Sequence, residues 1–147
     1  MLIGSFNFTL DSKNRVSIPA KFRKSLDAEG NNKFYINRGV SKCIEVYPAE
    51  QWKILMDSLT RLNSFNAENA IFKRVYLQNA AEVSLDGQSR LLLPTSLIEF
   101  AGIEKDAFIL GAITKIEIWN PAIYNELVQQ QAESFEQIAE KVMGNQL

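Results

Sequence analysis

The stretch Asp-Ser-Lys-Asn-Arg-Val-Ser-Ile-Pro, residues 11–19, decides the fold because the chain contains the same pattern twice. Residues 86–94 read Asp-Gly-Gln-Ser-Arg-Leu-Leu-Leu-Pro, 75 positions downstream, and both stretches follow Asp-x-x-x-Arg-φ-x-φ-Pro, where φ is hydrophobic. A second match joins residues 43–48, Cys-Ile-Glu-Val-Tyr-Pro, to residues 115–121, Lys-Ile-Glu-Ile-Trp-Asn-Pro, 72 positions downstream. We therefore expect two similar halves, each near the size at which a single core is marginal, that pack together.

The first motif is predicted to be a turn between two strands, followed by a short helix. Residues 4–10 alternate between apolar and polar side chains, as in a half-buried strand. Residues 11–14 are typical of a turn, residues 15–18 return as a strand, and a proline opens the helix over 19–26. Similar patterns predict strands at 34–37, 42–47, 83–85, 91–93, 107–110 and 115–119. They also predict a helix that starts at Pro48 and helices over 67–78 and 94–101. One long terminal helix is expected from Pro121, with the apolar residues Ile123, Leu127, Phe135 and Ile138. Residues 144–147 are expected to fray.

The composition is typical of an ordinary globular protein. Hydrophobic residues make up 46% and charged residues 22% of the chain, and its apolar runs are too short to span a membrane. The first residues lack the basic and apolar segments of a signal peptide, so we expect a cytoplasmic protein.

The chain has no histidine and a single cysteine, Cys43. This usage excludes an internal disulfide, a cysteine-rich zinc site and the Ser-His-Asp or Cys-His arrangements of hydrolytic enzymes. Cys43 lies in an apolar run, where a buried structural thiol is the usual role. An enzyme would have to rely on carboxylates, lysine or tyrosine, and we therefore expect no catalytic activity, no metal site and no cofactor.

Charge is unevenly distributed along the chain, although the net charge is only −1. Residues 1–24 contain five bases and one acid, whereas residues 120–147 contain four acids and one base. A focused positive face can attract nucleic acid without a basic total. The N-terminal region is therefore the predicted positive face.

The repeated motif suggests a chemistry for its charged residues. An aspartate at the start of a turn can accept hydrogen bonds from backbone N–H groups and pair with the arginine four residues later. An arginine at the mouth of a hairpin can donate two hydrogen bonds to guanine in the major groove of DNA. The first copy offers Asp11 and Arg15, with Lys13 as a phosphate-seeking charge. The second offers Asp86 and Arg90, with no lysine in the turn.

Simpler roles remain open for the same residues. Arg15 and Arg90 could each form a structural salt bridge with the aspartate of its own turn, and the duplication could serve stability alone. Lys21 and Lys24 could line a solvated helix face, and Arg23 could pair with a carboxylate. Packing does not require a charged turn to be repeated, so the repetition favours a binding role.

The doubled motif, the order of strands and helices and the chain length resemble the MraZ family, bacterial regulators associated with the division and cell-wall gene cluster. Residues 1–6 and 17–23 resemble this family as well. The resemblance implies an α+β, mainly β fold: a double-psi or swapped-hairpin barrel of the AbrB type, built from two pseudo-two-fold-related halves in one chain, with flanking helices. We expect the first half at residues 1–62, a connecting helix at 63–80, and the second half with a C-terminal helix at 81–147.

The resemblance also implies a function. Members of the family bind short G-rich direct repeats ahead of their own operon, act mainly as repressors and assemble into rings of about eight subunits. This chain would then be a homo-oligomeric, nucleoid-associated protein that binds double-stranded DNA, with no membrane and no small-molecule substrate as partner. The implied DNA-binding residues are Arg15, Lys13, Arg90, Lys21, Arg23 and Lys24, and the implied turn-organising residues are Asp11, Asn14, Asp86 and Gly87.

Both turns depart from the family at one position. Family members usually carry glycine directly before the arginine, whereas this chain carries Asn14 and Ser89. Asparagine adopts a left-handed backbone more readily than serine does, and Gly87 is expected to move the bend of the second turn. Arg15 is therefore the firmer predicted base reader and Arg90 the weaker one.

Two other classes of protein remain as alternatives. An AbrB-type protein-interaction or antitoxin-like module, without specific DNA readout, would use the acidic, amphipathic C-terminal stretch to bind a protein partner. An enzyme would show a deep cleft with convergent acids, whereas a DNA reader would show a flat or convex basic face.

Overall fold

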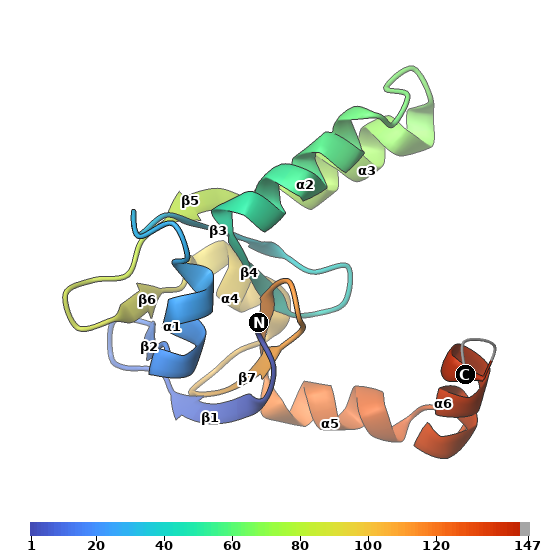
Figure 1. The fold of residues 1–147 in the computed structure, drawn as a ribbon. Helices are drawn as coiled ribbons and strands as arrows, with labels where there is room; N and C mark the ends of the chain where they lie inside the picture. Colours follow the sequence, from blue (N-terminus) through green and yellow to red (C-terminus); the bar gives the residue numbers. More distant parts are fainter. Residues whose placement is uncertain (145–147) are drawn as a thin grey trace.

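The computed structural model describes residues 1–144, which form an α+β chain (Figure 1). The strands are β1 (Ser5–Thr9), β2 (Arg15–Ser17), β3 (Phe34–Arg38), β4 (Ile44–Pro48), β5 (Ala81–Val83), β6 (Arg90–Leu92), β7 (Asp106–Gly111) and β8 (Ile116–Trp119). The helices are α1 (Ala20–Leu26), α2 (Ala49–Thr60), α3 (Ala67–Leu77), α4 (Thr95–Ala101), α5 (Pro121–Gln129) and α6 (Phe135–Met143). The predicted order of elements is confirmed up to α5. Of the residues expected to fray, 145–147 lie outside the described residues.

Six strands form one antiparallel sheet in the order β1-β7-β8-β4-β3-β5, and β2 pairs with β6 in a separate two-stranded sheet. The large sheet ends at β1 and β5, so within the described residues it is open rather than the closed barrel that the resemblance implied. It does not close because β2 and β6, which follow the two charged turns, pair with each other instead of extending the sheet. The α+β class is confirmed, and the AbrB-type swapped-hairpin detail stays a prediction.

The two copies of the repeat are interleaved. The pairings β1–β7, β2–β6, β3–β5 and β4–β8 each join a strand of the first copy to a strand of the second. Val16 lies opposite Leu91 at the centre of one pairing, and Glu45 lies opposite Glu117 at the centre of another. These partners occupy equivalent positions of the two copies, so an approximate two-fold axis relates the halves. The division at residues 1–62, 63–80 and 81–147 stays a prediction.

Alternation along the strands places the main core on one face of the large sheet. Ile44 and Val46 of β4 and Ile116 and Ile118 of β8 are at most 1% exposed, and the residues between them point to the other face. The small sheet, the residue that follows each of its strands, and helices α1 and α4 complete this core with Val16, Ile18, Phe22, Leu26, Leu91, Leu93, Leu97 and Ala101.

Two equivalent aromatic clusters lie on the other face of the sheet. Beside α2, Trp52 stacks on Tyr35 with ring centroids 5.3 Å apart and contacts Tyr47 at 5.5 Å. Beside α5, the aromatic rings at the equivalent positions pack with centroid distances of 4.7 Å for Phe108–Tyr124 and 5.3 Å for Trp119–Tyr124. Helices α2 and α5 are therefore anchored to the sheet by the same three-ring arrangement.

The expected single terminal helix is wrong, because the structure has two helices there, α5 and α6. The hydroxyl of Ser134 accepts a hydrogen bond from the N–H of Gln137, and the Gln137 side chain accepts one from the N–H of Ser134. This capping box starts a new helix. The α5–α6 arm and the α2–α3 hairpin both project from the body of the molecule (Figure 1). No helix among the described residues is long and apolar enough to cross a membrane.

Candidate nucleic-acid interface

One carboxylate organises the first charged turn. Asp11 Oδ1 accepts hydrogen bonds from the backbone N–H groups of Lys13 at 2.9 Å and Arg15 at 3.0 Å, and Oδ2 accepts one from Arg15 Nε at 2.7 Å. These bonds, the backbone bond from Arg15 above all, lower the pKa of Asp11. The ionised carboxylate therefore holds the turn and the guanidinium group in one geometry.

The second turn repeats this arrangement. Asp86 Oδ1 accepts from the backbone N–H groups of Gln88 and Arg90, both at 2.9 Å, and Oδ2 accepts from Arg90 Nε at 2.9 Å. The pKa of Asp86 is lowered for the same reason, with the backbone bond from Arg90 as the largest cause. At the level of local geometry, the two turns are therefore equivalent.

The residue before each arginine has a left-handed backbone, with φ of 60° at both Asn14 and Ser89. A three-residue hairpin loop commonly closes with a residue in this conformation. Gly87 does not have a positive φ, and the bend lies at Ser89. The expectation that Gly87 moves the bend is wrong, because the hydrogen bonds of Asp86 dictate the same loop in both copies.

The tertiary structure joins the two turns into one cluster. Arg15 Nη1 lies 3.8 Å from Asp86 Oδ2, and Arg90 Nη1 lies 3.6 Å from Asp11 Oδ2, in addition to the pairs within each turn. The four side chains are 24–34% exposed. Sequence reasoning anticipated only the pairs within each turn. The turn cluster, Asp11, Arg15, Asp86 and Arg90, spans two motifs that are 75 positions apart.

Backbone hydrogen bonds fasten each turn to the opposite half. The N–H of Ile18 donates to the carbonyl of Ser89 at 3.1 Å, and the N–H of Leu93 donates to the carbonyl of Asn14 at 3.0 Å. These bonds extend the β2–β6 pairing on both sides. The two arginines are therefore carried on a shared backbone support at the approximate two-fold axis.

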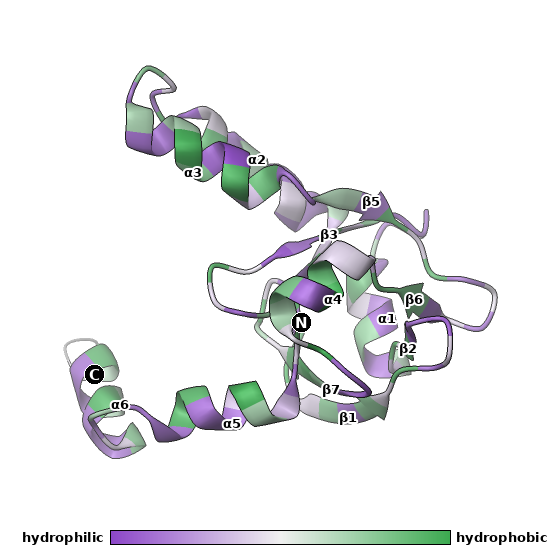
Figure 2. Cartoon of the chain, turned by 180° about the vertical axis from the view of Figure 1, so that it is seen from behind, coloured by the Kyte–Doolittle hydropathy of each residue, from purple (hydrophilic) through white to green (hydrophobic). Residues whose placement is uncertain are grey.

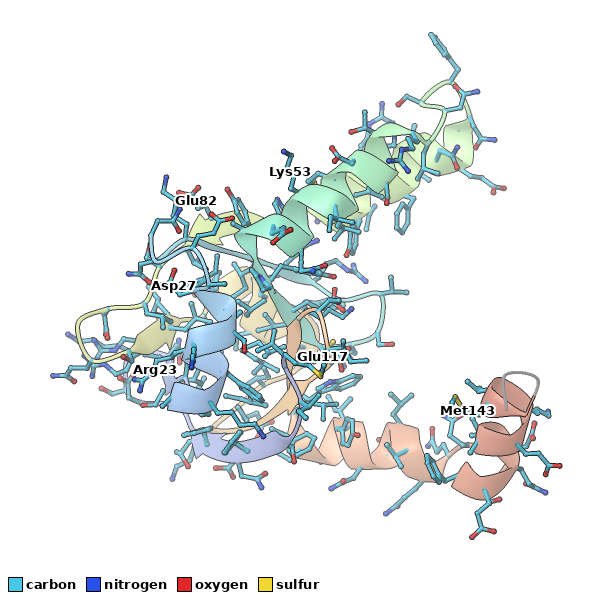
Figure 3. All side chains as sticks on the ribbon, in the orientation of Figure 1. Arg23, Asp27, Lys53, Glu82, Glu117 and Met143 are labelled. Carbon is cyan, nitrogen blue, oxygen red and sulfur yellow. The ribbon has the colours of Figure 1, made fainter. Side chains whose placement is uncertain are left out.

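The remaining predicted bases lie at different distances from the turn cluster. Lys13 is exposed within the first turn, where the second turn has Gln88. Arg23, which is half-buried, lies on α1 (Figure 3), and Lys24 is exposed on the same helix. Lys21 Nζ lies against Gly4, at the start of β1 and away from the turn that follows this strand. The structure therefore brings Lys13 to the arginines but not Lys21.

Sequence reasoning missed a buried polar cluster at the centre of the large sheet. Glu45 is 4% exposed, lies opposite Glu117 and forms an ion pair with Lys115. The Tyr47 hydroxyl donates a hydrogen bond to Glu45 at 2.9 Å. A signal existed in the sequence, because the two glutamates occupy equivalent positions of the repeated strands.

Three of the central groups could in principle bind a metal ion, because Cys43 Sγ and carboxylate oxygens of Glu45 and Glu117 lie within 4.8 Å of one another. Burial raises the pKa of the Cys43 thiol, which therefore stays protonated. Burial, the largest single influence, acts to lower the pKa of Lys115, but the hydrogen bond to Glu45 and the charges of Glu45 and Glu117 together outweigh it, and the pKa is raised. A protonated thiol and an ammonium group that already neutralises Glu45 suit a structural ion pair better than a metal site.

Ser89→Gly is expected to raise the free energy of unfolding by about 1 kcal/mol, because glycine adopts the left-handed backbone without the steric cost of a Cβ atom. Urea denaturation measures the change. Ser84→Gly is the matched control at an exposed position without a positive φ, and it should lower stability by about 0.5–1 kcal/mol. Equal effects at the two positions would contradict the assigned backbone strain.

The fold and the site together define a class of protein. The chain is a tandem-duplicated α+β protein whose interleaved halves present two symmetry-related Asp–Arg turns as one charged cluster. The chain belongs to the MraZ family, since the family model described as "MraZ protein, putative antitoxin-like" matches residues 1–75 and again residues 76–146.

Curated relatives agree with the family assignment. A protein of Natranaerobius thermophilus is 41% identical over 143 residues, which cover 97% of both chains. A protein of Clostridium beijerinckii is 40% identical over 142 residues, covering 97% of this chain and 96% of its own. A protein of Christiangramia forsetii is 37% identical over 145 residues, covering 98% and 94%. Each of them is named "Transcriptional regulator MraZ".

Proposed function

We propose that this chain is a sequence-specific DNA-binding transcriptional regulator, mainly a repressor, that reads short G-rich direct repeats upstream of the division and cell-wall gene cluster. The observation that carries the proposal is the turn cluster, in which two arginines are held side by side by two aspartates. The name shared by the relatives supports the regulatory part of the proposal.

The geometry of the two guanidinium groups supports base reading. Each Nε is bound by the aspartate of its own turn, and each Nη1 lies 3.6–3.8 Å from the aspartate of the other turn. Among the described residues, the side-chain hydrogen bonds of Arg15 and Arg90 to the aspartates use Nε, and none uses Nη2. An arginine fixed at Nε can offer its outer Nη groups to guanine O6 and N7 without losing side-chain entropy on binding.

The surrounding charges supply the phosphate contacts of the proposed complex. Lys13 is the base best placed to contact the backbone beside the turn cluster, and Arg23 and Lys24 on α1 extend the basic surface. Lys21 would contact DNA only if the duplex reached the start of β1. Occupation of a promoter in this way would exclude RNA polymerase, which is the proposed basis of repression.

One pair of turns would bind a short repeat weakly, so the proposal includes assembly. A homo-oligomeric ring of about eight subunits would present many turn clusters to tandem repeats, and the second contact would benefit from a high effective concentration. DNA that follows such a ring must bend, which adds a dependence on the deformability of the sequence. The protein would then be cytoplasmic, nucleoid-associated and without enzymatic activity.

The family description supports a second candidate function, an antitoxin-like module that binds another protein. Under this alternative the acidic C-terminal region, with Glu126, Glu133, Glu136 and Glu140, would bind a basic partner. Specific DNA readout by the turn cluster would then be absent, and the two candidates are separated by the same experiment.

The test is binding of the purified chain to a promoter fragment with tandem G-rich repeats, beside a fragment of equal length with the repeats scrambled. The repeat fragment should bind at least about 100-fold more tightly than the scrambled fragment. Raising the salt from about 50 to 200 mM should weaken binding at least tenfold, because binding releases counterions from the DNA. Equal affinity for both fragments would reject specific readout and make the protein-interaction module the leading candidate.

A further inference from the structure

The two-stranded sheet of β2 and β6 presents one of its faces to solvent. Side chains alternate along a strand, so Val16 and Leu91 point into the core while the residues on either side of each point outward. The outward residues are Arg15, Ser17, Arg90 and Leu92. A two-stranded antiparallel ribbon fits the major groove of DNA with one face toward the base edges. Figure 2 shows β2 and β6 on the side of the body away from both helical arms, where a duplex can approach.

The symmetry of the turn cluster is broken at two positions beside the arginines. Leu92 corresponds to Ser17 in the repeat, and Lys13 corresponds to Gln88. The approximate two-fold axis therefore places Lys13 and Leu92 on one flank of the arginine pair, and Gln88 and Ser17 on the other. The first flank is basic and apolar, whereas the second is neutral and polar.

The flank of Lys13 and Leu92 contains a hollow of about 490 Å³. Its lining includes the apolar side chains of Val83, Leu92 and Pro94, and of the described residues that line it only Lys13 is charged. Leu92 is 58% exposed and lies directly opposite Arg15 in the β2–β6 pairing. The hollow therefore begins beside the arginine pair, with a leucine in its wall and a positive charge at its rim.

These features match one chemical group of DNA. The C5 methyl of thymine is an apolar group in the major groove, and apolar side chains recognise it by direct contact. Leu92 has no hydrogen-bonding group in its side chain, so the donors and acceptors of any other base edge would be left unpaired against it. Lys13 at the rim would meet a backbone phosphate, which positions the base without reading it.

We propose that the hollow beside Leu92 receives the C5 methyl group of a thymine next to the guanine read by the turn cluster. Leu92 then determines specificity at a base pair that neither arginine contacts, and Lys13 holds the adjoining phosphate. Ser17 and Gln88 are polar at the equivalent place, so the cluster binds a repeat in one direction. This inference rests on the proposed function and adds a second base to it.

The test replaces thymidine with deoxyuridine in the repeat fragment, which removes the C5 methyl and leaves base pairing unchanged. Each thymidine position of the repeat is exchanged in turn, on both strands and in every repeat of the fragment. The wild-type chain should lose affinity at least about fourfold at one position, the effect of losing one buried methyl contact. The other positions should change little.

Leu92→Ser assigns the effect to this side chain, since serine is the residue at the symmetric position. The variant should bind the thymidine fragment as weakly as the wild type binds the deoxyuridine fragment, and should not distinguish the two. Leu127→Ser is the matched control, because it makes the same exchange at an exposed position of α5, and it should keep the wild-type discrimination. Circular dichroism checks that both variants are folded.

The possible failures of this inference and of the proposed function are distinct. Repeat-specific binding that is indifferent to deoxyuridine at every position would reject this inference and leave the proposed function standing. A methyl effect that persists in Leu92→Ser would reject it as well, because another group would then contact the thymine. Equal affinity of the wild type for the repeat and scrambled fragments would reject the proposed function, and this inference with it.

Discussion

Arg15→Ala is expected to weaken binding to the repeat fragment at least about 100-fold. One lost bidentate contact to guanine costs about 1–3 kcal/mol, and the loss recurs in every subunit that meets a repeat. The variant should fold normally, because Asp11 keeps its backbone hydrogen bond from Lys13 and its ion pair with Arg90. Titration of repeat and scrambled fragments measures the change, which should fall almost wholly on the repeat fragment.

Arg90→Ala should weaken specific binding to a similar extent. The two arginines make equivalent contacts in the turn cluster, although the sequence alone predicts that Arg90 is a weaker base reader than Arg15. Arg61→Ala is the matched control, because it removes the same charge from an exposed position at the C-terminal end of α2, and it should change affinity by less than about twofold. If Arg15→Ala and Arg61→Ala bind the repeats equally well, the turn is structural and another surface must recognise DNA.

Phe22→Ala should lower the free energy of unfolding by about 3–5 kcal/mol, the usual cost of replacing a buried phenylalanine with alanine. The Phe22 side chain is 0% exposed and packs edge-to-face on Phe6, with ring centroids 5.3 Å apart. Its loss leaves a cavity between α1 and the sheets, at the place where the interleaved halves share one core. Urea denaturation at fixed protein concentration measures the effect, because assembly would add its own stabilisation.

Phe65→Ala provides the matched control for this substitution. Phe65 is fully exposed between α2 and α3, so the same change should alter stability by no more than about 0.5 kcal/mol. Similar losses for Phe22→Ala and Phe65→Ala would mean that α1 does not seal the core as described.

Most local structure of this chain was predictable because its signals are local. Alternating side chains predicted the strands, prolines marked the starts of helices, and Gly102 ends α4 with a left-handed backbone at φ 65°. The long terminal helix was a wrong prediction because the apolar spacing continued across residues 130–134. The capping box at Ser134 and Gln137, which restarts the helix, was a visible signal that outweighs this spacing.

The candidate site was predictable in part for the same reason. Asp11 and Arg15 are four residues apart, so their pairing within one turn follows from turn chemistry. The sequence by itself therefore determined the repeated unit, the composition of both charged turns and the family to which they belong.

Only the tertiary structure decided that the two turns form one cluster. That outcome depends on the register in which Val16 meets Leu91, and on the hydrogen bonds that join each turn to the opposite half. The tertiary structure also decided that the large sheet is open and that Glu45 lies opposite Glu117 in the β4–β8 register. Pairing between segments more than 70 positions apart is selected by the burial of a whole shared core, and no local pattern in either segment encodes it.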